Sequence, residues 1–194
     1  MKFTELNLSG AFEVSPKPYL DTRGEFLRMF CFDTFSAKEL NTSWLQHNIS
    51  KNPYCGTFRG LHFQIGTSAE VKLVSCLRGA VLDLIIDLRP HSETFGQSCG
   101  VKLTSTLGNS IYVPKGFGHG YLTLEDNSEV MYLASENYSP KAESGINILK
   151  SNLTLFDSKS VMKISDRDLS LPSFEDFLAT IGSDPFWYQT ELNS

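Results

Sequence analysis

The chain has 194 residues, and its 17 lysines and arginines against 22 aspartates and glutamates give a net charge of −5. This length suits one domain with a buried core, so we expect residues 1–194 to form a single domain. The acidic balance and the lack of a Lys/Arg-rich run exclude nucleic acid as a partner, and no apolar run approaches the roughly 20 residues that a membrane-spanning helix needs.

Short apolar runs separated by glycine, asparagine and proline indicate β-structure through the middle of the chain. The expected strands are, in chain order, 71–77, 80–88, 101–104, 110–113, 121–124 and 130–134. Arg78 and Gly79 separate the first two, a connection that favours a tight hairpin. A short helix is expected to begin at Ser36 and another at Ser173, where Asp176 resembles part of a capping box. This pattern predicts a mainly β protein with a jelly-roll barrel and a few short helices.

The second expected strand has one apolar face, whereas its other face combines Val81 and Ile85 with Asp83 and Asp87. Side chains alternate between the two faces of a strand, so both carboxylates lie among apolar neighbours. A mixed face of this kind can form the wall of a pocket.

The four cysteines of the chain stand far apart in the sequence and form no CxxC pair. They could form two disulfides, but the first residues contain no apolar stretch like that of a secretory signal. We therefore expect free thiols and a cytoplasmic location.

The segment 59–64, with the sequence RGLHFQ, holds the densest group of unusual residues. Alternation places His62 and Gln64 on one face and leaves the other face apolar. A lone histidine in this setting is more often a core residue than a functional one. Lys72 follows on the next strand among apolar neighbours, where a lysine needs an anionic partner. We expect Asp83 to supply that carboxylate.

Two histidines in a small β-barrel, His62 and His119, first suggest a metal site. Metal-binding barrels of the cupin type gather several histidines and a glutamate on adjacent strands. Here Gln64 stands where a second histidine would be needed, and no glutamate follows within five positions, so we expect no metal. The chemistry that remains is acid–base: a neutral histidine is a natural base near pH 7, and Lys72 is suited to stabilise an enolate oxygen.

Five separated segments resemble the dTDP-4-dehydrorhamnose 3,5-epimerases and their nucleotide-sugar epimerase relatives, in the order found in that family. They are 21–26 (DTRGEF), 46–50 (QHNIS), 59–64 (RGLHFQ), 114–120 (PKGFGHG) and 165–168 (SDRD). The resemblance implies a cupin-like jelly-roll barrel, or double-stranded β-helix, that is a homodimer without metal or other cofactor. It implies an isomerase that epimerises C3, C5 or both in a nucleoside-diphosphate 4-keto-6-deoxy sugar such as dTDP-4-keto-6-deoxyglucose.

The same resemblance implies roles for individual residues. His62 is the expected base and Asp168 its partner, Lys72 stabilises the enolate oxygen, and Tyr132 delivers a proton to the opposite face. The implied substrate-binding residues are Arg23 at the diphosphate, Phe26 as a stacking surface for the base, Arg59 and His119 near the sugar, and Gln46, Asn48 and Tyr138 around the rest of the site. Arg28 stands where the family usually has a carboxylate, which reverses the charge beside the nucleotide and can change the preferred base.

Simpler interpretations stay open at several of these positions. Asp168 lies in an ordinary acidic turn, and Tyr132 shares a strand face with apolar residues that suit a core or interface. Arg23 equally suits an exposed turn, and Phe26 an ordinary strand. The alternative functions are a mono-epimerase, a 3,4-ketoisomerase on a GDP-, CDP- or dTDP-linked 4-keto sugar, and a non-catalytic sugar-nucleotide binding module.

Overall fold

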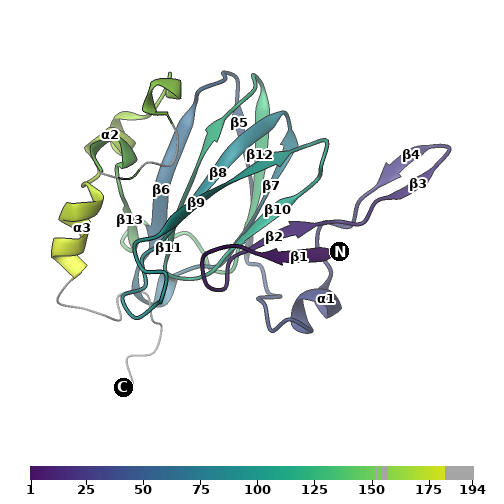
Figure 1. Cartoon of the computed structure of the whole chain (residues 1–194), viewed down its shortest axis with the longest axis horizontal. Helices are drawn as coiled ribbons and strands as arrows, with labels where there is room; N and C mark the ends of the chain where they lie inside the picture. Colours follow the sequence, from purple (N-terminus) through teal and green to yellow (C-terminus); the bar gives the residue numbers. More distant parts are fainter. Residues whose placement is uncertain (152, 154–156, 182–194) are drawn as a thin grey trace.

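Two antiparallel β-sheets packed face to face make up most of the structure, a computed structural model that describes residues 1–151, 153 and 157–181 (Figure 1). The six-stranded sheet has the order β1 (Lys2–Glu5), β2 (Phe12–Ser15), β10 (Ser110–Val113), β7 (Lys72–Arg78), β12 (Ser128–Ala134) and β5 (Gln46–Asn52). The five-stranded sheet has the order β13 (Glu143–Gly145), β6 (Phe58–Gln64), β11 (Phe117–Thr123), β8 (Ala80–Asp87) and β9 (Ser98–Thr104). This arrangement confirms the predicted jelly-roll barrel.

Alternation along β8 fills two separate apolar clusters. Val81 and Ile85 point between the sheets and pack with residues of both, including Val74 of β7. Leu84 and Ile86 point to the outer side of the five-stranded sheet, where Phe177 of the C-terminal helix covers them. The predicted division of this strand into two faces is therefore correct.

The predicted hairpin at Gly79 is wrong. β7 and β8 follow one another in the chain but lie in different sheets, with β7 beside β10 and β12 and β8 beside β9 and β11. Gly79 has a φ of 72°, and a Cβ there would lie 2.6 Å from Oγ of Ser128. The glycine therefore permits a sharp passage from one sheet to the other, which a jelly roll needs and which the length of the connection alone does not reveal.

The helices are short, as predicted, but one begins elsewhere. α1 (Phe32–Ser36) ends at the residue where a helix was expected to begin, because Glu39 has a φ of 57° and the amide of Leu40 bonds back to the carbonyl of Phe35. Phe35 of this helix is buried against the outer side of the six-stranded sheet.

The other helices are α2 (Asp166–Ser170) and α3 (Phe174–Ile181), with single 3₁₀ turns at Gly66–Ser68, Ile148–Lys150 and Ser158–Ser160. α3 follows Ser173 as predicted, and the Ser173 hydroxyl accepts a bond from the amide of Asp176.

The hairpin of β3 (Tyr19–Asp21) and β4 (Gly24–Phe26) extends away from both sheets (Figure 1). In the described part of the chain, no helix is long and apolar enough to cross a membrane. Cys31, Cys55, Cys76 and Cys99 are free thiols. The expectation of a single domain extends to residues 182–194, which lie outside the described residues, and it stays a prediction.

Candidate active site

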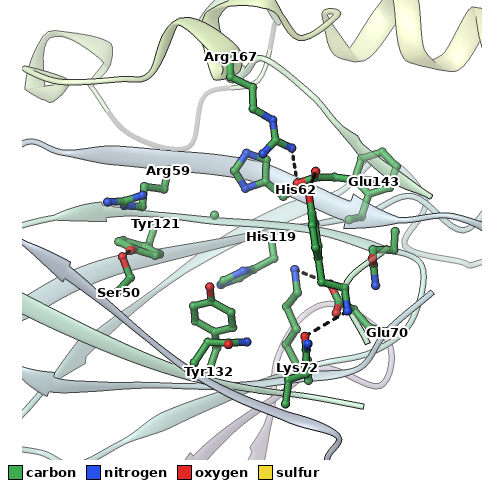
Figure 2. A pocket seen from close by; sticks show the side chains of 17 residues that line it. Ser50, Arg59, His62, Glu70, Lys72, His119, Tyr121, Tyr132, Glu143 and Arg167 are labelled. Atoms are coloured by element: carbon green, nitrogen blue, oxygen red, sulfur yellow. Dashed lines mark hydrogen bonds and ion pairs between the residues drawn. The ribbon is translucent and has the colours of Figure 1, made fainter. Parts of the chain in front are cut away.

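A cavity of about 530 Å³ lies between the two sheets, and side chains of both sheets line it (Figure 2). The predicted site residues that line it are Gln46, Asn48, Arg59, His62, Lys72, His119, Tyr132 and Tyr138. We call it the main cavity. Asp168 lies beside it, lining a smaller hollow that also includes His62.

His62 is paired with Asp168 at the edge of the main cavity. Nε2 of His62 lies 2.7 Å from Oδ1 of Asp168, and Oδ2 of Asp168 accepts a bond of 3.3 Å from the amide of Gly60. Burial raises the pKa of Asp168, but the hydrogen bond and charge of His62 and the amide of Gly60 outweigh it, so the pKa lies below its usual value. An ionised Asp168 accepts a hydrogen bond from Nε2–H, which leaves Nδ1 of His62 as the basic nitrogen.

The start of α2 holds Asp168 in this position. The Ser165 hydroxyl caps the helix by accepting a bond of 3.1 Å from the amide of Asp168. Two residues before Ser165, the carbonyl of Lys163 accepts a hydrogen bond from the amide of Phe58, which ties this part of the chain to the beginning of β6. The segment 165–168, which reads as an acidic turn in the sequence, therefore forms the start of a helix that holds Asp168 against His62.

Two glycines determine which residues of β6 face the main cavity. A Cβ on Gly60 would lie 2.6 Å from Cα of Gly120, and one on Gly120 would lie 2.5 Å from the carbonyl oxygen of Arg59. At this contact the pairing of β6 with β11 shifts register between His119 and Tyr121. Strict alternation would separate Arg59 from His62, yet both line the cavity because of this irregularity.

Lys72 enters the main cavity from the six-stranded sheet. Nζ of Lys72 lies 3.1 Å from Oε1 of Glu70, and each of these side chains is only 12% exposed. The expectation that Asp83 is the ion-pair partner of Lys72 is therefore wrong. Glu70 precedes Lys72 by two residues in an extended segment, so both point the same way.

Asp83 pairs with His119 instead. Its Oδ2 lies 3.0 Å from Nε2 of His119, and its other oxygen, Oδ1, is buried with no hydrogen-bond partner. Burial raises the pKa of Asp83, against the opposing charges of His119 and Lys72. His119 lines the main cavity, whereas Asp83 is fully buried and does not, so the mixed face of β8 supports a lining histidine from the neighbouring strand rather than forming the cavity wall itself.

Tyr132 of β12 stands across the main cavity from His62 (Figure 2). The two side chains come from opposite sheets, since β6 belongs to one and β12 to the other. Burial raises the pKa of Tyr132, with a lowering effect from Arg59 and a further raising effect from Glu70. Its hydroxyl therefore keeps its proton at neutral pH.

The lining of the main cavity includes three connected side chains, two of which the sequence did not single out. The Tyr138 hydroxyl donates to Glu143, and Glu143 also forms an ion pair with Arg167. Gln46 contributes by accepting a bond of 3.1 Å from the amide of Tyr138. Arg167 lies inside the recognised SDRD segment, but Glu143 carries no signal of its own, because a strand of three residues is too short for a pattern.

Arg23, Phe26 and Arg28 do not line the main cavity. Arg23 and Phe26 lie on or within the β3–β4 hairpin, away from the barrel, and all three residues are exposed. Arg23 pairs with Asp21 at 2.5 Å, and its side chain is 88% exposed. Their predicted roles in nucleotide binding stay predictions.

The geometry suits proton transfer on both sides of a ring held between the sheets. A histidine–carboxylate pair provides a base on one side, a protonated tyrosine provides an acid on the other, and an ammonium group is available for a developing negative charge. Among the described residues, no three His, Cys, Asp or Glu side chains are grouped to hold a metal ion. The prediction of a metal-free site stays a prediction.

Comparisons with known proteins agree with this chemistry. A family model described as dTDP-4-dehydrorhamnose 3,5-epimerase matches residues 5–176. The dTDP-4-dehydrorhamnose 3,5-epimerase of Mycobacterium tuberculosis (strain ATCC 25618 / H37Rv) is 38% identical over 198 residues, which cover 98% of this chain and 96% of that protein. The crystal structure of the enzyme of the same name from Elizabethkingia anophelis has a TM-score of 0.85 at 34% identity and covers 91% of this chain and 97% of its own. The structure of NovW, a 4-keto-6-deoxy sugar epimerase from Streptomyces spheroides, has a TM-score of 0.85 at 30% identity and covers 94% of this chain and 91% of its own.

Proposed function

Because the chain belongs to the dTDP-4-dehydrorhamnose 3,5-epimerase family and is therefore a sugar-nucleotide epimerase, we propose that it inverts C3 and C5 of dTDP-4-keto-6-deoxyglucose. Neighbouring structures support this substrate class, since one from Bacillus anthracis has TDP bound and one from Legionella pneumophila is a complex with dTDP-4-keto-L-rhamnose. Those ligands belong to the neighbours, and their transfer to this chain is part of the proposal.

In the proposed reaction, Nδ1 of His62 takes the proton from a carbon beside the C4 carbonyl. The electron pair of the broken C–H bond forms a carbon–carbon double bond, and the carbonyl π pair moves onto oxygen to give an enolate. The ammonium of Lys72 stabilises that oxygen, and Asp168 stabilises the imidazolium. Tyr132 then donates its proton to the opposite face of the same carbon, which inverts the centre and returns the carbonyl.

The position of His62 and Tyr132 on opposite sheets is the observation that carries this proposal. Inversion requires that a proton leaves one face of a carbon and arrives at the other, and a single base on one wall would return it to the same face. An acid and a base on opposite walls, with Lys72 beside them, are the minimum that this chemistry needs.

Deuterium exchange tests the proposal directly. Incubation with dTDP-4-keto-6-deoxyglucose in D₂O should place deuterium at C3 and at C5, as followed by NMR. Exchange at only one carbon would identify a mono-epimerase. One relative, from Streptomyces niveus, carries the name dTDP-4-dehydrorhamnose 3-epimerase. A carbonyl moved to C3 would identify a 3,4-ketoisomerase. If the protein binds the dTDP-, GDP- and CDP-linked sugars but exchanges deuterium into none of them, it is a non-catalytic binding module.

The proposal extends to a cytoplasmic homodimer in which the β3–β4 hairpin of one copy reaches the main cavity of the other. Arg23 and Phe26 are expected to bind nucleotide but lie away from the cavity of their own chain. The hairpin also exposes large apolar side chains, with Leu20 74% and Phe26 62% exposed, which a partner subunit would cover. The four free thiols support the cytoplasmic location.

Mixed dimers test this arrangement. Co-expression of an Arg23→Ala chain with a His62→Ala chain should restore about a quarter of wild-type activity, because a hairpin acting on the partner leaves one site of each mixed dimer intact. Each variant alone should be nearly inactive. A monomer in analytical ultracentrifugation, or no recovery in the mixture, would contradict the shared site.

A further inference from the structure

The ion pair of Glu70 and Lys72 lies inside the main cavity rather than at the surface. Oε1 of Glu70 is 3.1 Å from Nζ of Lys72, and both side chains line the cavity and are 12% exposed. In the described part of the chain, the other Lys–Glu ion pairs are more exposed: Lys115 and Glu136 are 34% and 32% exposed, and Lys51 and Glu129 are 75% and 27% exposed. Burying a carboxylate in a pocket is costly and needs a compensating partner.

From this geometry we infer that Glu70 is the positioning residue that aims Lys72 at the carbonyl oxygen of the substrate, an inference that rests on the proposed function. An ammonium group has three N–H donors. The bond to Glu70 uses one donor and limits rotation of the long lysine side chain, so the remaining donors point into the cavity in a fixed direction. Electrostatic stabilisation is most effective when the donor is already oriented before the charge develops.

The chain around Glu70 is held firmly enough to do this. Ala69 is fully buried and Val71 is 7% exposed, so both neighbours of Glu70 are anchored in apolar surroundings. The amide of Val71 donates to the Ser135 hydroxyl at 2.9 Å, and the amide of Ser135 donates to the carbonyl of Val71 at 3.0 Å. The backbone that carries Glu70 is therefore fixed to Ser135, which directly follows β12, the strand that carries Tyr132.

The other nearby carboxylate is already engaged. Asp83 is held at 3.0 Å by His119 and acts on Lys72 only through its charge. Glu70 also influences Tyr132, whose pKa its charge helps to raise. One carboxylate thus acts on both the enolate-stabilising cation and the acid of the proposed reaction.

A double-mutant cycle in the deuterium-exchange assay tests the inference. Glu70→Gln keeps the shape of the side chain but removes its charge, and we expect kcat to fall about 10- to 100-fold with KM changed less than about 3-fold, because a misdirected group costs rate more than binding. In a Lys72→Gln background, the same Glu70→Gln change should cost a much smaller factor, since the positioning effect acts through Lys72 and only the weaker effect on Tyr132 remains. Glu136→Gln removes a carboxylate from a Lys–Glu pair outside the cavity and is the matched control, with exchange expected within about 2-fold of wild type.

The outcomes separate the two ideas. If the wild type exchanges deuterium and Glu70→Gln does so at the same rate, the positioning role is overturned while the proposed function stands. The role is equally overturned if Glu70→Gln costs the same factor with and without Lys72. If the wild type exchanges nothing, the proposed function is wrong, and the role of Glu70 in it falls as well.

Discussion

His62 and Asp168 are 106 positions apart in the chain, yet Nε2 of the imidazole lies 2.7 Å from Oδ1 of the carboxylate. The contact joins β6 of the barrel to α2, which lies outside both sheets. Asp168 is buried, and three groups bond to it or support it: His62, the amide of Gly60 and the Ser165 hydroxyl. Such an arrangement fixes both the tautomer and the orientation of the base.

Replacing Asp168 by asparagine should therefore impair proton removal more than binding. The amide keeps the shape of the carboxyl group but cannot stabilise an imidazolium, and it can favour the wrong tautomer. We expect kcat for deuterium exchange to fall roughly 100- to 10,000-fold, within the range seen when a histidine base loses its carboxylate. Asp166→Asn removes an exposed carboxylate from the same helix and is the control. Equal losses for the two variants would show that the effect comes from the helix and not from the dyad.

Much of this site could be predicted from residues alone, and the limits have physical causes. His62 and Gln64 share a strand face, and Lys72 stands out as a lysine among apolar residues, so local rules find them. Asp168 needed the family resemblance, because nothing local connects an acidic turn to a strand more than 100 positions earlier.

The partners within the cavity were harder to predict. Alternation along an extended chain places Glu70 on the same side as Lys72. Asp83 is the more conspicuous candidate in the sequence, because a carboxylate stands out among the apolar residues of its strand. The wrong hairpin at Gly79 has a similar origin, since chain neighbours pair only when the sheets place them side by side.

Asp87 should stabilise the fold chiefly as an ionised group. Its carboxylate is fully buried and accepts bonds from Arg89, Ser92 and Thr94 at 2.5–3.0 Å. Burial raises the pKa of Asp87, but these bonds outweigh it and the pKa lies below its usual value. The stabilisation is therefore present above pH ~4, the value for an unfolded aspartate, and is lost as the pH falls through the lower folded pKa. Asp87→Asn should reduce the free energy of unfolding by about 3 kcal/mol at pH 7 and by progressively less in acid, as measured by urea titration.

Asp83 lies four residues earlier on the same face of β8 and should behave in the opposite way. Burial raises its pKa, so the folded state favours the protonated form, and the stabilisation is lost as the pH rises above ~4 through the folded pKa. Relative to wild type, Asp83→Asn should therefore become more stable as the pH rises above ~4, seen as a larger free energy of unfolding in urea titration. A pH dependence parallel to that of Asp87→Asn would contradict the assignment of opposite shifts.

The close contact of Gly120 with β6 should tolerate no side chain. A Cβ at Gly120 meets the Arg59 carbonyl oxygen at 2.5 Å and Cα of Gly60 at 3.0 Å, and these backbone atoms cannot move without separating the two strands. Gly120→Ala should lower the free energy of unfolding by about 3 kcal/mol or more. Gly100→Ala is the matched control, since it also lies in a strand but meets only the movable ends of leucine side chains at 3.1 Å and 3.2 Å. Neither glycine has a positive φ, so similar losses for both variants would contradict a special role for the close contact at Gly120.

Tyr132→Phe should separate proton removal from inversion. Without the hydroxyl, His62 can still take a proton and return one to the face from which it came, so deuterium enters the substrate while its configuration is retained. We expect formation of the inverted sugar to fall about 100-fold or more, with a smaller loss of deuterium wash-in, both measured by NMR in D₂O. Tyr112→Phe removes a hydroxyl on the outer side of the six-stranded sheet, where it accepts a bond from the amide of Asn41, and should leave the ratio of inversion to exchange unchanged. If Tyr132→Phe instead lowers exchange and inversion by the same factor, the tyrosine acts before the enolate forms, and the acid on that wall must be another group.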